Sequence, residues 1–268
     1  MTDLLRLSRR SFVVMPLALA ACGGGTSVAR ISGSTMGTSY SVVALQGSRK
    51  LDDSEVKAAI DGALASVNRQ MSNWDADSEI SRFNNQTEMA PIAISADLAE
   101  VMGAAEAVHG ASGGVFDTTM GPLIELWGFG APGSSALPSE SDIAAALGRS
   151  GHGNMLQVEQ GALRKVHPDA QVYLAAIGKG YGADRVGRAL ETLGVTDYMV
   201  EIGGDIFAAG RNPDGLPWQI GIETPSAHSR DVLEVVGISD LGLASSGDYR
   251  NYFERDGQRY SHLIDPRT

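Results

Sequence analysis

The sequence predicts an α+β fold, a mixed domain in which helices accompany antiparallel sheets. Two kinds of pattern support this class. Several stretches repeat apolar residues at the spacing of an amphipathic helix, whereas the second half of the chain is rich in short alternating stretches bounded by glycines. The 268 residues are 43% hydrophobic and 20% charged, a composition that suits a folded domain with a sizeable core.

The first part of the chain predicts a pair of strands followed by long helices. Residues 29–45 (ARISGSTMGTSYSVVAL) predict two short strands around a glycine turn. A helix is predicted from Asp52, which has capping-box spacing to Glu55. A second helix is predicted from Ser95, and the HGASGG stretch ends it. The apolar face of the first helix comprises Val56, Ile60, Leu64, Val67 and Met71.

The second half continues with loops, strands and one more long helix. Residues 131–141 (APGSSALPSES) predict a loop, and we place a boundary between two lobes near residue 135. A short helix is predicted from about Ser139, strands within residues 154–175, and a glycine-rich helix over residues 178–194. Further strands are predicted by YMVEIGGDIFAAG, WQIGIE, VLEVVGI and LGLASS.

The N-terminus has the composition of a lipoprotein export signal. Residues 1–11 are cationic, residues 12–21 form an apolar stretch too short to span a bilayer, and small residues precede Cys22, the only cysteine. This pattern resembles a bacterial lipobox. It predicts a signal peptide over residues 1–21, lipidation of Cys22, a tether over residues 22–30, and a protein of the bacterial cell envelope, lipid-anchored to a membrane and facing the periplasm. A buried helix with a chance cysteine is the alternative, and Sec and twin-arginine export both remain open.

The net charge of the chain indicates which ligands it can bind without a specific site. A net charge of −11 disfavours nonspecific binding of nucleic acid, so no nucleic-acid partner is expected. A phosphate-bearing ligand would need a local attraction. The GKGYGA stretch offers one, because backbone N–H groups at a helix start together with Lys179 make a phosphate cradle; an ordinary helix entry is the alternative.

Other motifs carry weaker predictions. The GASGG stretch matches a hydrolase elbow, but a helix precedes it where a strand is required, so Ser112 is predicted to end a helix and not to act as a nucleophile. Trp74 follows the first helix among acidic residues and is either a stacking platform or a cap on the core.

The histidines show no metal-ligand spacing. His262 lies in an apolar stretch that predicts a strand, beside Asp265 and Arg267, and a structural role is its alternative. The remaining four have the surroundings of surface or loop residues: His109, His152, His167 and His228.

Taken in order, several stretches resemble the ApbE-type flavin transferases, which move FMN from FAD onto a protein threonine. They run from about Ile31 to the end of the chain: TMGTSYSV, MSNWDADSEISRFN, GGVFDTTMGPLIELWGFG, AAIGKGYGADRV, VEIGGD and SSGDYRNYFERDGQRYSHLIDPRT. The resemblance implies an ApbE-like domain over residues 31–268, with two lobes around an FAD cleft, and a magnesium-dependent reaction that releases AMP.

The resemblance also implies the roles of individual residues. It makes His262 the catalytic residue near the reacting phosphate and the main-chain carbonyl of Ala176 a magnesium ligand. Tyr173 stands where the family often has an acid. The residues implied to bind FAD are Met36, Trp74, Phe116, Asp117, Thr118, Lys179 and Ile264.

In the family that the chain resembles, a strand and a helix follow DPRT, and the helix carries an aspartate and a threonine that bind magnesium through their side chains. We therefore expect the domain to be incomplete at the C-terminus, and this form to bind FAD weakly and to transfer FMN slowly or not at all. The implied acceptor is an exported flavoprotein, such as a subunit of an Nqr- or Rnf-type complex. Two alternatives are a metal-dependent FAD pyrophosphatase and a noncatalytic FAD-binding lipoprotein.

Overall fold

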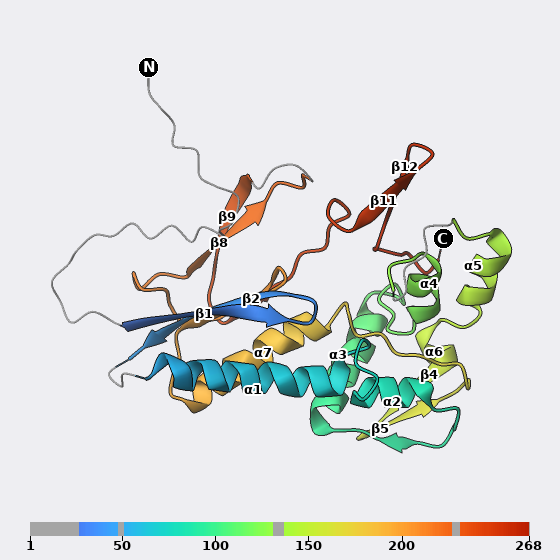
Figure 1. Ribbon diagram of the computed structural model, residues 1–268, viewed down its shortest axis with the longest axis horizontal. Helices are drawn as coiled ribbons and strands as arrows, with labels where there is room; N and C mark the ends of the chain where they lie inside the picture. The colour runs from blue at the N-terminus through green and yellow to red at the C-terminus, as the bar shows by residue number, and fades with distance from the viewer. Residues whose placement is uncertain (1–26, 48–50, 131–136, 227–230, 268) are drawn as a thin grey trace.

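The computed structural model describes residues 27–47, 51–130, 137–226 and 231–267 (Figure 1). Within them, helices pack on antiparallel sheets, which confirms the predicted α+β class. The predicted signal peptide, the lipidation site Cys22 and the lobe boundary near residue 135 lie outside the described residues. No helix in the described ranges is long and apolar enough to cross a membrane.

A five-stranded antiparallel sheet forms the first lobe. Its strands, in spatial order, are β1 (Ser27–Thr35), β2 (Thr38–Gln46), β6 (Tyr198–Ile202), β7 (Asp205–Ala209) and β10 (Leu241–Leu243). Strand β1 already begins at Ser27, so the predicted tether over residues 22–30 is wrong at its C-terminal end. The physical reason is burial, since Ala29 is 1% exposed in the core of this lobe and Val28 packs on the opposite face of the sheet.

Both faces of strand β2 are covered. Helices α1 (Asp53–Met71) and α7 (Gly178–Thr192) lie side by side on one face, and the ribbon of β8 (Trp218–Glu223) and β9 (Val232–Ile238) lies over the other (Figure 1). Val42 and Ala44 contribute to the core beneath the helices, whereas Val43 and Leu45 contribute to the core beneath the ribbon. This alternation is the two-residue period of a strand.

The second lobe continues from the same long helix. The predicted apolar face of α1 is confirmed, but its residues divide between two cores: Val56, Ile60 and Leu64 belong to the first, Val67 and Met71 to the second. The other elements of the second core are α2 (Glu79–Asn85), α3 (Ala96–Ala111) and a small sheet of β3 (Ile92–Ala93), β5 (Ala162–Lys165) and β4 (Leu156–Glu159). Helix α1 therefore joins the two lobes.

Short helices and a hairpin complete the fold. The hairpin of β11 (Tyr252–Arg255) and β12 (Gln258–Ser261) rises beside the short helices near the end of the described chain (Figure 1). Those helices are α4 (Gly121–Leu126), α5 (Glu140–Leu147) and α6 (His152–Met155). Residues 166–177 contain no strand, so the prediction of strands within residues 154–175 holds only for β4 and β5.

The predicted helix starts are confirmed by their caps. The Asp52 carboxylate accepts the backbone N–H of Ser54, and the Ser95 hydroxyl accepts that of Leu98. Ser139 forms a full capping box with Asp142. Side-chain acceptors at these positions satisfy N–H groups that an isolated helix start leaves unpaired.

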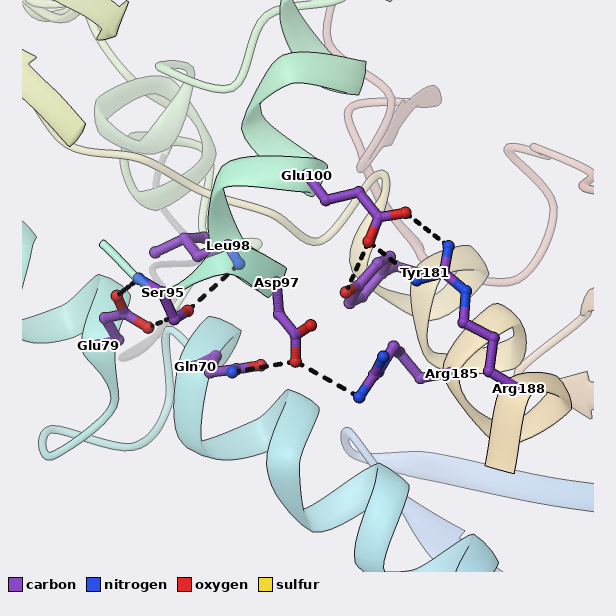
Figure 2. Close-up of polar contacts among 9 residues, drawn as sticks. All are labelled: Gln70, Glu79, Ser95, Asp97, Leu98, Glu100, Tyr181, Arg185 and Arg188. Atoms are coloured by element: carbon purple, nitrogen blue, oxygen red, sulfur yellow. Dashed lines mark hydrogen bonds and ion pairs between the residues drawn. The ribbon is translucent and has the colours of Figure 1, made fainter. Parts of the chain in front are cut away.

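Polar contacts tie the start of α3 to α7 and α1 (Figure 2). Arg188 donates to both oxygens of Glu100, at 2.9 and 2.5 Å, and the hydroxyl of Tyr181 donates to the same carboxylate at 3.3 Å. Asp97 accepts from Gln70 and lies 3.6 Å from Arg185. The hydrogen bonds from Arg188 lower the pKa of Glu100, so this carboxylate stays ionised and keeps α7 in place.

Candidate functional site

Lys179 stands in the first turn of α7, facing the turn between β6 and β7. Its ammonium lies 3.3 Å from Oδ2 of Asp205 and donates to the carbonyl of Gly203 at 3.4 Å. The Lys179 side chain is 32% exposed, whereas that of Asp205 is 13% exposed. The lysine is thus anchored on one side and open to solvent on the other, as a phosphate-binding lysine must be.

The turn opposite Lys179 depends on glycine. Gly203 and Gly204 have φ angles of +55° and +97°, in the region that glycine adopts without strain. A Cβ atom on Gly203 would lie 2.8 Å from the methyl group of Thr38, so only glycine allows this approach. Glu201 accepts the N–H of Gly204 at 2.6 Å, and burial raises the pKa of its carboxyl. The VEIGGD stretch contains Glu201 and Asp205, but no local pattern in the sequence predicts a role for either.

Met36 lies against the same end of α7. It occupies the two-residue turn between β1 and β2 with a φ of +50°, followed by Gly37 at +72°, as a tight hairpin requires. Its Cε would be 2.9 Å from a Cβ atom on Gly182, and the side chain packs against the cores of both lobes. The structure therefore places Met36 beside Gly182, near the end of α7 that carries Lys179, and the contact of either residue with FAD stays a prediction.

Ala176 lies just before α7 and is exposed. The N–H groups of Ile177 and Gly178 donate to the carbonyl of Leu174, which starts the helix. Around Ala176, and elsewhere in the described part of the chain, no group of three or more His, Cys, Asp or Glu side chains could hold a metal ion. The described residues therefore do not form a magnesium cage, and the predicted carbonyl ligand stays a prediction.

The loop after α1 presents Trp74. Its side chain is 72% exposed, so the alternative of a cap on the core is wrong and the indole faces are free to stack. The base of the loop is well held, because the Ser72 carbonyl accepts the hydroxyls of Ser78 at 2.6 Å and Ser81 at 3.1 Å.

Asp117 and Thr118 face inward. One oxygen of Asp117 accepts both the N–H and the hydroxyl of Thr119, at 2.7 and 2.6 Å, and the other accepts the N–H of His152 at 2.9 Å. Thr118 is only 3% exposed. The protein's own groups thus engage these side chains, and their contact with FAD stays a prediction.

Phe116 is half-buried and follows the end of α3. Its N–H donates to the hydroxyl of Ser112 at 2.9 Å, and this hydroxyl also donates to the His109 carbonyl at 3.1 Å. Ser112 caps a helix and orders the next turn, which confirms the structural prediction for it.

His152 is not the surface residue that the sequence suggested. It is 5% exposed and stacks on His109 with ring centroids 4.8 Å apart, while Thr118 Oγ1 lies 3.4 Å from its Nδ1. Burial, and secondly the charge of His109, lower the pKa of His152, whereas Asp117 and Glu106 oppose the shift. His228 lies outside the described residues.

Acidification is expected to destabilise the protein through His152. A lowered pKa in the folded state means stability that is present above the unfolded value of about 6.5 and lost as the pH falls through the folded pKa. Thermal melting between about pH 7.5 and about pH 5.5 measures this loss. A His152→Phe variant keeps the stacked ring and should flatten the profile, whereas His167→Phe, at an exposed position, should not; identical profiles for all three proteins would contradict the assignment.

His262 follows β12, which ends at Ser261, so its predicted place within a strand is wrong. Its backbone N–H donates to the Asn251 carbonyl at 3.1 Å, and the ring Nδ1 lies 3.1 Å from the same oxygen. A carbonyl oxygen only accepts, so Nδ1 carries the hydrogen and Nε2 of the neutral ring can accept a proton.

An aromatic cluster holds this end of the chain against the segment after α4. Phe129 contacts His262 edge-on at 6.3 Å and stacks on Phe253 at 5.6 Å. Tyr260 stacks between Phe253 and Trp127, at 5.3 and 5.4 Å. Such contacts fix the position of the β11–β12 hairpin, and with it that of the catalytic candidate.

Ile264 packs against the apolar cluster of α4 and α5, whose buried members are Met120, Leu123 and Ala146. It is half-buried, so its predicted pocket-lining role is compatible with its position but stays a prediction. The site residues thus fall into two groups, one around the start of α7 and one beside α4. Tyr173, whose N–H donates to the Thr118 carbonyl at 2.7 Å, connects them.

Tyr173, for which the resemblance implies a position often held by an acid, acts here through ring packing and a hydroxyl hydrogen bond. Its ring covers Gly121 so closely that a Cβ atom there would lie 2.2 Å from it, and its hydroxyl donates to Glu125. Burial raises the pKa of Tyr173, so the hydroxyl stays a donor.

A cavity of about 590 Å³ has Glu125, the partner of this tyrosine, in its wall and is lined by none of the predicted flavin residues. It is lined by the end of α2 and the loop that follows, by one side of α4, by Arg149 and by residues near Pro168.

The fold and the site define an α+β protein whose helix entry, with its open lysine, suits a phosphate-bearing ligand. Residues 36–268 match the model of the ApbE family. The FAD:protein FMN transferase of Vibrio cholerae is 42% identical over 253 residues, which cover 94% of this chain and 75% of the relative. That of Haemophilus influenzae is 43% identical over 263 residues, covering 96% and 76%. The chain belongs to the ApbE family.

Solved structures of ApbE proteins also match the fold of this chain. The flavin transferase ApbE from Vibrio cholerae superposes with a TM-score of 0.82 at 40% identity, covering 90% of this chain and 77% of the other. The apo flavinyl transferase ApbE of Pseudomonas stutzeri gives a TM-score of 0.80 at 36% identity, covering 90% and 75%.

Proposed function

We propose that this protein is an FAD:protein FMN transferase that moves the FMN moiety of FAD onto a threonine of a target flavoprotein. One observation carries the proposal. Lys179 is open at the start of α7, opposite a glycine turn, in a chain that is 42 and 43% identical to two proteins of that name.

The chemistry is phosphoryl transfer. The threonine oxygen forms a bond to the FMN-side phosphorus of FAD, the bond to the bridging oxygen breaks, and AMP leaves with that oxygen. Negative charge on the phosphates is the main obstacle, and Lys179 together with the N-terminal N–H groups of α7 opposes it. The threonine proton passes to a base, for which Nε2 of His262 has the required free lone pair.

Trp74 and Met36 serve the nucleotide in this proposal. An exposed indole provides a flat apolar surface for a flavin or adenine ring. Met36, at the end of α7 that carries Lys179, places a flexible apolar side chain beside the phosphate-binding lysine.

Magnesium dependence is also proposed, because the cation supplies charge neutralisation for phosphates when it is bound. The Ala176 carbonyl would be one ligand, and no group of three or more His, Cys, Asp or Glu side chains in the described residues could hold the ion, so no step is assigned to it.

The setting is proposed from the N-terminal pattern. Lipidation of Cys22 would hold the protein in the bacterial cell envelope, facing the periplasm, where its acceptor would be an exported flavoprotein such as an Nqr- or Rnf-type subunit. A Cys22→Ser variant that stays in the membrane fraction after cell lysis would contradict this.

AMP release tests the function. The protein is incubated with FAD, magnesium and either an acceptor protein or the same acceptor with its target threonine replaced by valine. AMP equimolar with modified acceptor, and none with the valine acceptor, is the expected result. Equal AMP release with both acceptors would show a pyrophosphatase instead.

Lys179→Met is expected to weaken FAD binding about tenfold, because a charged contact to phosphate contributes about 1.4 kcal/mol or more. Fluorescence titration with FAD measures the affinity. Lys179→Arg keeps the charge and should retain most of the binding. Wild-type affinity in the methionine variant would show that Lys179 does not contribute to FAD binding.

A further inference from the structure

The segment that leads into α7 is held by side chains and not by a sheet. Val172 and Leu174 are 0 and 2% exposed, yet residues 170–177 contain no strand. Buried backbone groups need partners, and an irregular segment must find them elsewhere. Two asparagines from a distant part of the sequence supply them.

Asn84 pairs with both backbone groups of one residue. Its side-chain oxygen accepts the N–H of Val172 at 2.8 Å, and its side-chain nitrogen donates to the Val172 carbonyl at 3.0 Å. This asparagine lies in the last turn of α2, and within the described residues its side-chain hydrogen bonds reach Val172 but not the start of α7. Its contribution is to anchor one point of the segment.

Asn73 bridges two residues of the same segment. It donates to the Val172 carbonyl at 2.7 Å and accepts the N–H of Leu174 at 3.2 Å. A carbonyl and an N–H two residues apart are the groups that a neighbouring strand would engage. The Asn73 side-chain amide therefore takes the place of the N–H and C=O that one residue of a neighbouring strand would offer.

Leu174 connects the Asn73 side chain to the start of α7 through hydrogen bonds of its own backbone. Its N–H is held by Asn73, while its carbonyl accepts the N–H groups of Ile177 at 3.0 Å and Gly178 at 2.7 Å. Lys179 is the next residue. The position of the helix entry thus depends, through one residue, on the side chain of Asn73.

Asn73 also directly precedes Trp74. The Trp74 N–H donates to Ser72 Oγ at 3.2 Å, so the backbone on both sides of Asn73 is ordered. We infer that Asn73 is a positioning residue that sets the spacing between the exposed face of Trp74 and the ammonium of Lys179. This inference rests on the proposed function, because both groups are taken to bind FAD.

A pair of matched variants tests the inference. Asn73→Asp keeps the shape and the acceptor for Leu174 but puts a carboxylate oxygen against the Val172 carbonyl. Asn84→Asp makes the same change on the same carbonyl, away from Trp74 and Leu174. FAD affinity is measured by fluorescence titration, and the melting temperature by circular dichroism.

Both variants are expected to melt at lower temperature, but only Asn73→Asp should lose FAD affinity, by about tenfold, a loss that one displaced charged contact would cause. The effect of Asn73→Asp should also shrink in a Lys179→Met background, since both changes act on one contact. Equal affinity losses in the two aspartate variants, unchanged affinity in Asn73→Asp, or full additivity with Lys179→Met would overturn the inference.

The test is independent of transfer. A wild-type protein that binds FAD but modifies no acceptor would contradict the proposed function and leave the positioning result standing. A wild-type protein that binds no FAD would overturn both.

Discussion

A His262→Gln variant is expected to transfer FMN about 100-fold more slowly than the wild type while binding FAD about equally well. The imidazole Nδ1 faces the Asn251 carbonyl, which leaves Nε2 as the proton acceptor. Glutamine can preserve the hydrogen bond to Asn251 but offers no basic nitrogen. The observed rate constant at saturating FAD, followed by covalent flavin fluorescence on the acceptor, measures the effect.

His167→Gln is the matched control, because this histidine is exposed and pairs only with Asp169, 3.9 Å away, among the contacts of the described chain. Its transfer rate should equal that of the wild type. An unchanged rate in His262→Gln would remove this residue from the chemistry. A parallel loss of FAD affinity would show that it binds the nucleotide and does not move the proton.

Replacing Lys165 with methionine is expected to lower the free energy of unfolding by about 3 kcal/mol, because it removes a buried ammonium that donates to three backbone carbonyls. Lys165 is 0% exposed, and its ammonium donates to the carbonyls of Asn84, Gln86 and Pro168, at 2.9, 2.5 and 3.3 Å. Burial lowers the pKa of this ammonium, and the ring of Phe83 lies 5.3 Å from it. Methionine fills a similar volume but cannot donate.

Urea unfolding measures the loss. Lys57→Met is the control, since this lysine pairs with Asp61 on the surface and its removal should leave the midpoint close to that of the wild type. A Lys165→Met variant as stable as the wild type would mean that water or a moved loop satisfies the three carbonyls.

The parts of the fold that could be predicted are those with a local signal. The apolar face of α1 repeats along one helix, and the cap at Ser95 precedes an apolar run, so both helices could be placed from sequence. The turn at Met36 and Gly37 has a glycine between alternating strands. The resemblance to a family then supplied roles that periodicity alone could not.

The missed features depend on contacts between distant residues. Asn73 and Asn84 hold a segment 88 to 101 residues away, and side-chain pairing with irregular backbone leaves no periodic pattern. His152 is buried because it stacks on His109 from another helix, which a lone histidine in a glycine-rich stretch does not reveal. Glycine and serine after Cys22 predict a tether to residue 30, whereas the strand begins at Ser27 because Ala29 is buried in the core.

The intact mass of an acceptor protein tests the central claim most directly. The acceptor is incubated with this protein, FAD and magnesium, and in parallel with the Vibrio cholerae relative as a positive control. The account predicts an acceptor that gains the mass of one FMN moiety on its threonine, however slowly, and no gain when that threonine is replaced by valine. An acceptor that the relative modifies and this protein leaves unchanged after prolonged incubation would contradict the claim.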